Sequence, residues 1–159
     1  MVSQHLSEVK ELVKIKLTDS IGDSNLIEES MLYSSLADSK MIRAGLIFAS
    51  AETNPNLDIS SVITLATSIE LMHTYSLVHD DLPCMDDDDM RRNQPSNHIK
   101  YGEANAVLTG DALQALAYEI LCNDINLSAQ DKIRAIKLLS QACGKTGMVL
   151  GQHLDIQNE

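Results

Sequence analysis

Acidic and basic side chains crowd into one short stretch, LVHDDLPCMDDDDMRR at residues 77–92, which holds six aspartates and two arginines. Carboxylates about 4 Å apart repel each other by about 1 kcal/mol even in water, so this concentration favours a bound cation. Asp80 and Asp81 also end a helix-forming run, and the C-terminal end of a helix is already negative. Such oxygen ligands suit Mg²⁺, which binds through one or two carboxylates plus substrate phosphates. Because the guanidinium groups of Arg91 and Arg92 match phosphate oxygens, the stretch predicts a metal–diphosphate site.

Two other interpretations of these aspartates exist. An acidic run can be no more than a solvated loop, and the run alone leaves that alternative open. A calcium loop of the EF-hand type needs oxygen ligands at alternate positions and a central glycine, whereas DDLPCMDDDDMR has leucine and cysteine there. His73 favours the metal–diphosphate site, because it lies seven residues, or two helical turns, before Asp80. We expect both side chains to project from one helix face into the same space, although a lone histidine on an apolar stripe is more often a core residue.

The elements that position these groups are predicted to be helices, because apolar residues recur at helical spacing almost throughout the chain. Ser128 and Asp131 have the spacing of a helix-opening cap. No strand-like alternation extends beyond a few residues, so the predicted fold is all-α, an antiparallel helical bundle in one domain. We expect the helix ending at Asp80 and the helix starting near Gly102 to be antiparallel neighbours. The predicted helices cover about residues 2–17, 28–36, 39–51, 60–80, 102–121, 128–143 and 144–159.

The apolar stripes of these helices predict which residues are buried. The first stripe contains Leu6, Val9, Val13 and Leu17. In the helix after Gly102, the predicted stripe comprises Leu108, Asp111, Ala115 and Tyr118. Because an unpaired carboxylate inside a core costs several kcal/mol, we expect Asp111 to be buried and hydrogen-bonded to a structural partner.

Composition excludes several classes of function. The formal net charge of −11 argues against nucleic acid or an anionic membrane surface as a partner. The three cysteines lie far apart without CxxC spacing, which is typical of reduced thiols in a cytoplasmic protein. No apolar run approaches the roughly 18 residues of a membrane span, and the first residues do not resemble a signal peptide. We therefore expect a cytoplasmic protein without a membrane span.

One long segment resembles a known family. HTYSLVHDDLPCMDDDDMRRNQPSNHIKYGEANAVLTGDALQALAYEIL is similar to the first half of the short-chain trans-polyprenyl diphosphate synthases, most of all the bacterial farnesyl diphosphate synthases, or geranyltranstransferases. Asp80, Asp81 and Asp86 form a DDx4D element that resembles the first aspartate-rich motif of the family. The resemblance implies a helical isoprenoid synthase fold. It also implies a Mg²⁺-dependent head-to-tail condensation of isopentenyl diphosphate with an allylic diphosphate, dimethylallyl or geranyl diphosphate.

The resemblance also implies roles for residues near the aspartates. Asp80 and Asp86 match the Mg²⁺ ligands, and Asp81 supports them. Arg91 matches the contact to the allylic diphosphate. Arg92 matches a contact to isopentenyl diphosphate.

Further matches lie elsewhere along the chain. In DSKMIRA, Lys40 and Arg43 match the lysine and arginine that bind isopentenyl diphosphate. His73 matches a histidine that also binds isopentenyl diphosphate. Gln152 and Asp155 match the GQxxD element that lines the site near the helix ends. Tyr75 and Ser76, five and four positions before Asp80, match the positions that set product length, and the resemblance implies a C15 product.

The chain departs from the family pattern in two ways. DSKMIRA stands where the family usually reads GGKRxRP, and the added carboxylate of Asp38 is expected to weaken a diphosphate pocket. The second aspartate-rich motif, DDxxD, is absent, so residues 1–159 are expected to be the N-terminal part of a synthase domain, inactive by itself. The alternative is a non-catalytic interaction or regulatory subunit that pairs with a complete synthase. In either case we expect a homodimer or a higher oligomer.

Overall fold

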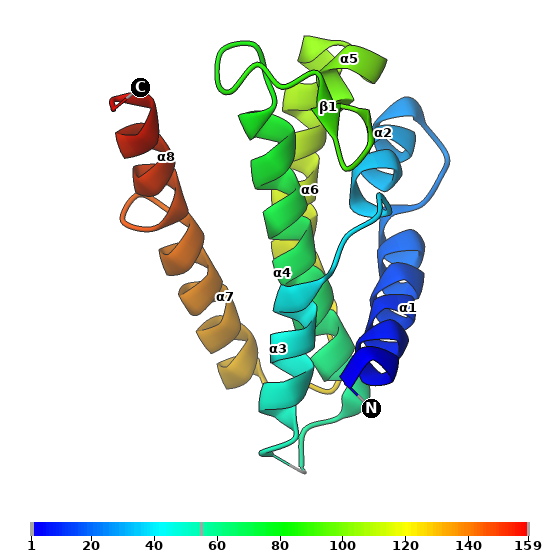
Figure 1. The fold of residues 1–159 in the computed structure, drawn as a ribbon. Helices are drawn as coiled ribbons and strands as arrows, with labels where there is room; N and C mark the ends of the chain where they lie inside the picture. Colours follow the sequence, from blue (N-terminus) through cyan, green and yellow to red (C-terminus); the bar gives the residue numbers. More distant parts are fainter. Residues whose placement is uncertain (1, 55, 159) are drawn as a thin grey trace.

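A computed structural model describes residues 2–54 and 56–158, with side chains from residue 6 onward. Residues 1, 55 and 159, which the predicted domain includes, lie outside the described residues. The described chain is almost entirely helical, which confirms the all-α prediction (Figure 1). Its elements are α1 (Val2–Ile21), α2 (Leu26–Ser35), α3 (Ile42–Ala51), α4 (Ile59–Asp80), β1 (Met90–Arg91), β2 (Gln94–Pro95), α5 (Asn97–Tyr101), α6 (Glu103–Asn123), α7 (Ala129–Cys143) and α8 (Met148–Ile156).

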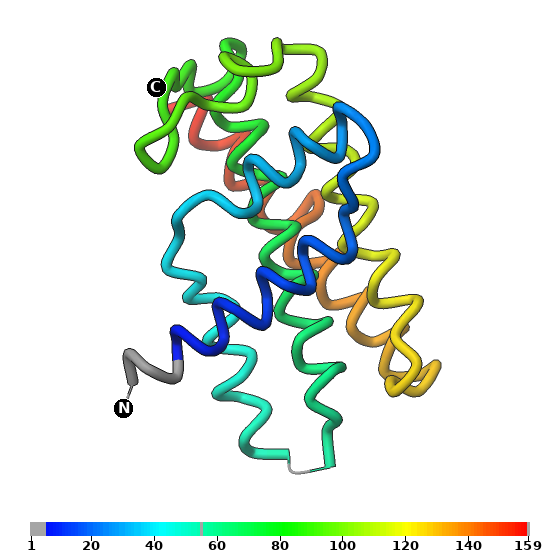
Figure 2. Tube along the Cα trace, turned by 90° about the vertical axis from the view of Figure 1, so that its right-hand side faces the viewer, coloured from blue at the N-terminus to red at the C-terminus, as the bar shows by residue number. Residues whose placement is uncertain are grey.

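Helix α4 is the centre of the bundle (Figure 1). It packs most extensively against α6, and the two helices run antiparallel, as expected from the sequence. Helices α1, α2 and α3 cover other parts of α4, while α7 and α8 lie along one side and contact the bundle less. Figure 2 shows α1 crossing the bundle obliquely, beside the segment that leads into α3. The acidic loop therefore follows directly from the best-packed helix.

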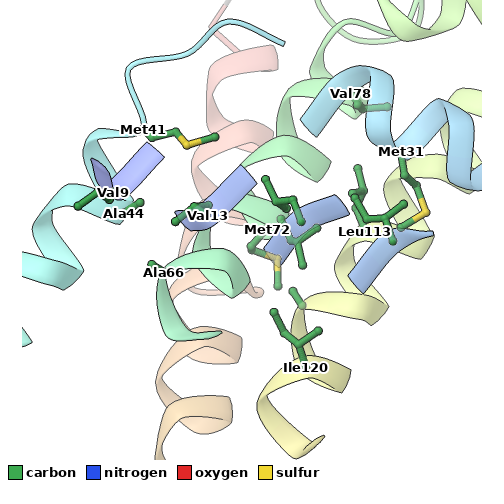
Figure 3. Close-up of a cluster of buried hydrophobic side chains, with 14 of the residues drawn as sticks. Val9, Val13, Met31, Met41, Ala44, Ala66, Met72, Val78, Leu113 and Ile120 are labelled. Carbon is green, nitrogen blue, oxygen red and sulfur yellow. The ribbon is translucent and has the colours of Figure 1, made fainter. Parts of the chain in front are cut away.

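The core confirms the predicted stripe on α1. Val9, Val13 and Leu17 are buried and Leu6 is partly buried. Val9, Val13 and Leu17 meet buried residues of α3, α4 and α6 in one apolar cluster (Figure 3). Together these contacts hold α4 from several sides.

The predicted burial of α6 is wrong by part of a turn. Asp111 is exposed, and so is Leu108, at 53%. The face turned toward α4 consists largely of small residues, among them Ala106, Gly110 and Ala117. Small side chains let two helix backbones approach closely, but they carry little hydrophobic signal, so the larger exposed Leu108 misdirected the prediction. Asp111 then needs no buried partner.

The ends of α7 are defined by local chemistry. At its start, Ser128 Oγ accepts a hydrogen bond from the Asp131 amide at 3.1 Å and donates one to Asp131 Oδ2 at 2.6 Å, which confirms the predicted cap. At its end, a Cβ atom on Gly147 would lie 1.9 Å from the carbonyl oxygen of Ala142, so the turn into α8 requires glycine. Neither α7 nor α8 has a buried residue. In the part of the chain described here, no helix is both long and apolar enough to cross a membrane.

Candidate active site

An ion pair lies at the C-terminal cap of α4. Asp81 is buried, and its Oδ1 accepts hydrogen bonds from Nε of Arg91, at 2.9 Å, and from Nη2 of the same residue. Arg91 Nη2 also lies 3.3 Å from Oδ2 of Asp88. The hydrogen bond to Asp81 is the main reason that the pKa of Arg91 is raised. Asp81 therefore holds an arginine in place, whereas Asp80 faces a different environment.

Asp80 is half-buried and lies near a second carboxylate. The amide of Asp86 donates a hydrogen bond to the carbonyl oxygen of Asp80 at 2.8 Å, so the loop folds back over the helix end. The side chain of Gln152 on α8 donates a hydrogen bond to Asp80 Oδ1 at 2.5 Å. Burial, and after it the negative charge of Asp86, raises the pKa of Asp80 to about 6. A cation bound between the two carboxylates would remove this repulsion.

The residues present fit Mg²⁺ on this chemical ground. Among the described side chains, no three His, Cys, Asp or Glu residues converge as a ready-made metal site. Mg²⁺ commonly binds through one or two carboxylates and takes its other ligands from water and substrate phosphates. Asp80 and Asp86 are the carboxylates that could hold it in this way.

A tight hairpin separates the two arginines. Arg91 pairs with Gln94 across the β1–β2 ladder, which leaves Arg92 and Asn93 as the two turn residues. Both have positive φ angles, 53° and 63°, as the central residues of a type I′ turn do. Arg91 reaches Asp81, whereas Arg92 lines a cavity on another side of α4. The sequence did not predict this hairpin, because Arg-Asn is not a usual type I′ pair.

Buried polar side chains anchor the segment after the hairpin to α2. Asn97 Nδ2 donates hydrogen bonds to the carbonyl oxygen and Oγ of Ser30 and to Oγ of Ser34, at 2.8–3.1 Å. Tyr33 donates a hydrogen bond from its hydroxyl group to the carbonyl oxygen of Pro95 at 2.8 Å. These anchors could not be predicted from the sequence, because a single Asn or Tyr residue carries no distinctive pattern. They fix the base of the loop that carries both arginines.

The cavity that Arg92 lines, here called the basic cavity, has a volume of about 430 Å³. It brings together Lys40, Arg43, His73 and Arg92, the residues that the sequence grouped around isopentenyl diphosphate. Asp38 and Glu70 also line it, together with Lys10, which the sequence analysis did not identify. The cavity therefore gathers cations from α1, α3 and the hairpin.

Two ionisable groups of α4 face the basic cavity, the buried Glu70 and the partly buried His73. Burial, and after it the positive charges of Arg43 and Arg92, lowers the pKa of His73 to about 4. The imidazole is therefore neutral near pH 7 and can donate one hydrogen bond. Glu70 accepts a hydrogen bond from the Ala44 amide at 3.0 Å, and its burial raises the pKa of the carboxyl group. This bond also holds the start of α3 against α4.

A second cavity, about 440 Å³ in volume, lies between the end of α4 and α8. Asp80, Gln152, Tyr75 and Ser76 line it, so both predicted product-length residues lie beside the aspartate. Tyr75 packs edge-on against the His79 ring, with ring centroids 5.0 Å apart. The His79 ring packs against Gly110 on α6, because a Cβ atom at that position would lie 2.1 Å from the ring and leave it no room.

The expectation that His73 and Asp80 share one space is wrong. His73 lines the basic cavity and Asp80 lines the second one. Seven residues of helix rise by about 10 Å, and different segments cover the two positions: the hairpin covers one and α8 the other. The positive charge of Arg91 acts on both side chains and lowers the pKa of each.

Comparison with known proteins agrees with this arrangement of aspartates and arginines around α4. The sequence profile described as "Polyprenyl synthetase" matches residues 24–159, most of the chain. The chain belongs to the polyprenyl synthetase family. The family resemblance predicted from the aspartate-rich motif is thereby confirmed.

Known polyprenyl synthetases are similar to this chain in sequence. Farnesyl diphosphate synthase of Buchnera aphidicola subsp. Acyrthosiphon pisum is 44% identical over 133 residues, covering 82% of this chain and 47% of the relative. The Escherichia coli farnesyl diphosphate synthase is 44% identical over 135 residues, covering 84% and 45%. Geranylgeranyl pyrophosphate synthase 9 of Arabidopsis thaliana is 46% identical over 135 residues, covering 84% and 37%. The chain thus spans about half the length of the curated relatives it matches.

Solved structures of polyprenyl synthetases share the fold. The apo crystal structure of an FPP/GFPP synthase from Zymomonas mobilis matches with a TM-score of 0.93 at 34% identity, covering 98% of this chain and 58% of that one. A geranyltransferase from Legionella pneumophila gives a TM-score of 0.91 at 34% identity, covering 98% and 56%. The eight described helices therefore form the same arrangement as the part of these structures that the chain covers.

Proposed function

We propose that this chain is the part of a farnesyl diphosphate synthase-like prenyltransferase that carries the first aspartate-rich motif. The observation that carries the proposal is the division of the two arginines by one hairpin. Arg91 lies at the aspartate end of α4, and Arg92 lies in the basic cavity. Two diphosphates can therefore bind on two sides of one helix, as a condensation of two diphosphate substrates requires.

The allylic diphosphate binds at the aspartate end. Asp80 and Asp86 would hold Mg²⁺, which would supply positive charge beside the departing diphosphate. Arg91 contacts the same diphosphate from its position on Asp81. Rupture of the bond between C1 and oxygen leaves an allylic cation, and the second cavity shields it from water.

Isopentenyl diphosphate binds in the basic cavity. Lys40, Arg43 and Arg92 supply the charge that its diphosphate needs, and the neutral imidazole of His73 donates a hydrogen bond. Its double bond attacks C1 of the allylic cation through C4, and loss of one proton completes the longer chain. Tyr75 and Ser76, beside the growing end, limit the product to C15.

The chain by itself is expected to be inactive. Its sequence contains one aspartate-rich motif, so the leaving diphosphate would be neutralised from one side only. Residues 1–159 would then be the N-terminal part of a synthase domain in a cytoplasmic protein with three free thiols.

The test is titration calorimetry of the purified 159-residue chain with each substrate and Mg²⁺, followed by a radiometric assay with isopentenyl and geranyl diphosphates. We expect binding of both substrates and no elongated product. Substantial farnesyl product would contradict the proposed inactivity, and failure to bind either substrate would contradict the proposed family function.

A second candidate function rests on apolar side chains that remain exposed. Leu108 on α6, Ile133 on α7 and Leu154 on α8 are about half or more exposed, and a polyprenyl synthase chain could cover them. The chain would then be a non-catalytic subunit, as a homodimer or in a complex with a full-length synthase. Light scattering at micromolar concentration tests the association. A species of 17.4 kDa would exclude the homodimer.

A further inference from the structure

Helix α1 crosses the start of α3 at close range. A Cβ atom on Gly45 would lie 3.0 Å from Cδ1 of Leu6, so the two helices meet where glycine leaves room. One turn further along α1, Val9 is 1% exposed and packs in the same cluster as Met41 and Ala44 (Figure 3). These contacts fix the position of the residue that follows Val9.

That residue is Lys10, and it lines the basic cavity. It is partly buried, and it comes from an element separate from those that carry Lys40, Arg43 and Arg92. Among the side chains that the structure describes, these four cations make no ion pair and no side-chain hydrogen bond, in contrast to Arg91. Cations gathered around one cavity without such partners are suited to a polyvalent anion.

The charge balance of the basic cavity depends on Lys10. Asp38 and Glu70 place two carboxylates among the lining residues, and His73 is neutral near pH 7. Lys40, Arg43 and Arg92 would leave one net positive charge against these carboxylates, and Lys10 raises it to two. A diphosphate carries more than one negative charge, so the additional lysine favours its binding.

We propose that Lys10 is a diphosphate-binding residue of the basic cavity, and that it offsets the carboxylate of Asp38. The identity of the ligand as isopentenyl diphosphate rests on the proposed function, whereas the binding of a diphosphate group rests on the cavity itself. Lys10 contributes its ammonium group from α1, so the docking of α1 on α3 is part of the site.

Lys14 provides a matched control. It lies one turn further along α1, carries the same charge and is also partly buried, but it lines a different cavity with Asp19 and Leu36. Lys10→Gln and Lys14→Gln therefore remove equal charge from the same helix. Lys10→Arg keeps the charge, and Asp38→Asn removes the opposing carboxylate.

The experiment is titration calorimetry of the 159-residue chain with inorganic pyrophosphate, and separately with isopentenyl diphosphate. We expect Lys10→Gln to raise the Kd for pyrophosphate about five- to tenfold, because the variant loses one charge-assisted contact. We expect Lys14→Gln and Lys10→Arg to stay within about twofold of the original chain, and Asp38→Asn to bind more tightly. Thermal unfolding of each variant checks that the fold is retained.

Equal effects of Lys10→Gln and Lys14→Gln would overturn the proposal, and so would failure of the original chain to bind pyrophosphate. If Lys10→Gln weakens pyrophosphate binding but isopentenyl diphosphate binds no more tightly than pyrophosphate, Lys10 keeps its role. The proposed prenyl substrate is then wrong.

Discussion

The side-chain amide of Gln152 donates a hydrogen bond to Oδ1 of Asp80 at 2.5 Å, joining residues 72 positions apart. This bond connects α8, a helix without buried residues, to the acidic end of the central helix. The position of α8 therefore depends on a polar contact with a candidate metal ligand more than on apolar packing.

Replacement of Gln152 by methionine should loosen α8. A hydrogen bond to a charged group contributes about 1.5–3 kcal/mol when buried, and less here because Asp80 is half-buried. We expect faster amide hydrogen exchange in residues 148–156, measured by mass spectrometry, with α4 unchanged. Gln141→Met, on the exposed surface of α7, is the control. Equal exchange in the two variants would show that the bond does not hold α8.

Asp80 should reduce stability at neutral pH. The pKa of its carboxyl group in the folded chain, about 6, lies above the ordinary 3.8, so ionised Asp80 is unfavourable in the fold. The contribution of Asp80 to the stability of the fold becomes more favourable as the pH falls from about 6 to 3.8, because the folded state binds the proton at a higher pH than the unfolded state does. We expect Asp80→Asn to raise the Tm at pH 7.5 by no more than about 2 to 4 °C, and the gain to shrink toward pH 4. A gain that does not depend on pH would contradict this assignment.

His73 should have the opposite effect on pH dependence. Its pKa is lowered from 6.5 to about 4 in the fold, so the unfolded chain binds the proton first. The stability that neutral His73 contributes is full above pH 6.5 and is lost as pH falls toward 4. Denaturant unfolding of His73→Gln should therefore show a smaller loss of stability between pH 6.5 and 4.5 than the original chain. His153→Gln, an exposed histidine on α8, should retain the original slope.

Asn97 should stabilise the hairpin that carries the arginines. Asn97→Ala removes the hydrogen bonds to Ser30 and leaves the Oγ of Ser34 without its side-chain partner, although Ser30 Oγ keeps a 2.7 Å hydrogen bond with Thr109 Oγ1. Such losses cost about 2–4 kcal/mol in total. We expect this drop in the free energy of unfolding by urea. Asn123→Ala, at the exposed end of α6, should change it by less than about 0.5 kcal/mol. Similar values for both variants would mean that the network does not anchor the loop.

Much of the fold could be predicted from apolar spacing, because α1 and α4 bury large side chains at helical intervals. Helix α6 was placed correctly along the chain but rotated wrongly, since small residues with little hydrophobic signal, such as Ala106, Gly110 and Ala117, make up much of its buried face. The hairpin could not be predicted, because its positive φ angles fall on Arg92 and Asn93, and no glycine at these positions indicates a turn.

The candidate site was predicted in part. Residues close in sequence, such as Asp80 and Asp86, could be grouped by their charge alone. The division of His73 and Asp80 between two cavities depends on which distant segments cover α4, and helical spacing does not contain that information. Lys10 was missed for the same reason, since only the crossing of α1 over α3 brings it to the basic cavity.

The most direct test of the central claim is titration of the 159-residue chain with a non-hydrolysable geranyl diphosphate analogue, with Mg²⁺ and with EDTA. We expect binding that requires Mg²⁺ and that weakens at least about tenfold in Asp80→Asn, because one carboxylate ligand is lost. Exposed Asp23→Asn, distant in sequence from the motif, should leave the Kd unchanged. Equal affinity in EDTA, or full affinity in Asp80→Asn, would contradict a metal–diphosphate site at the end of α4.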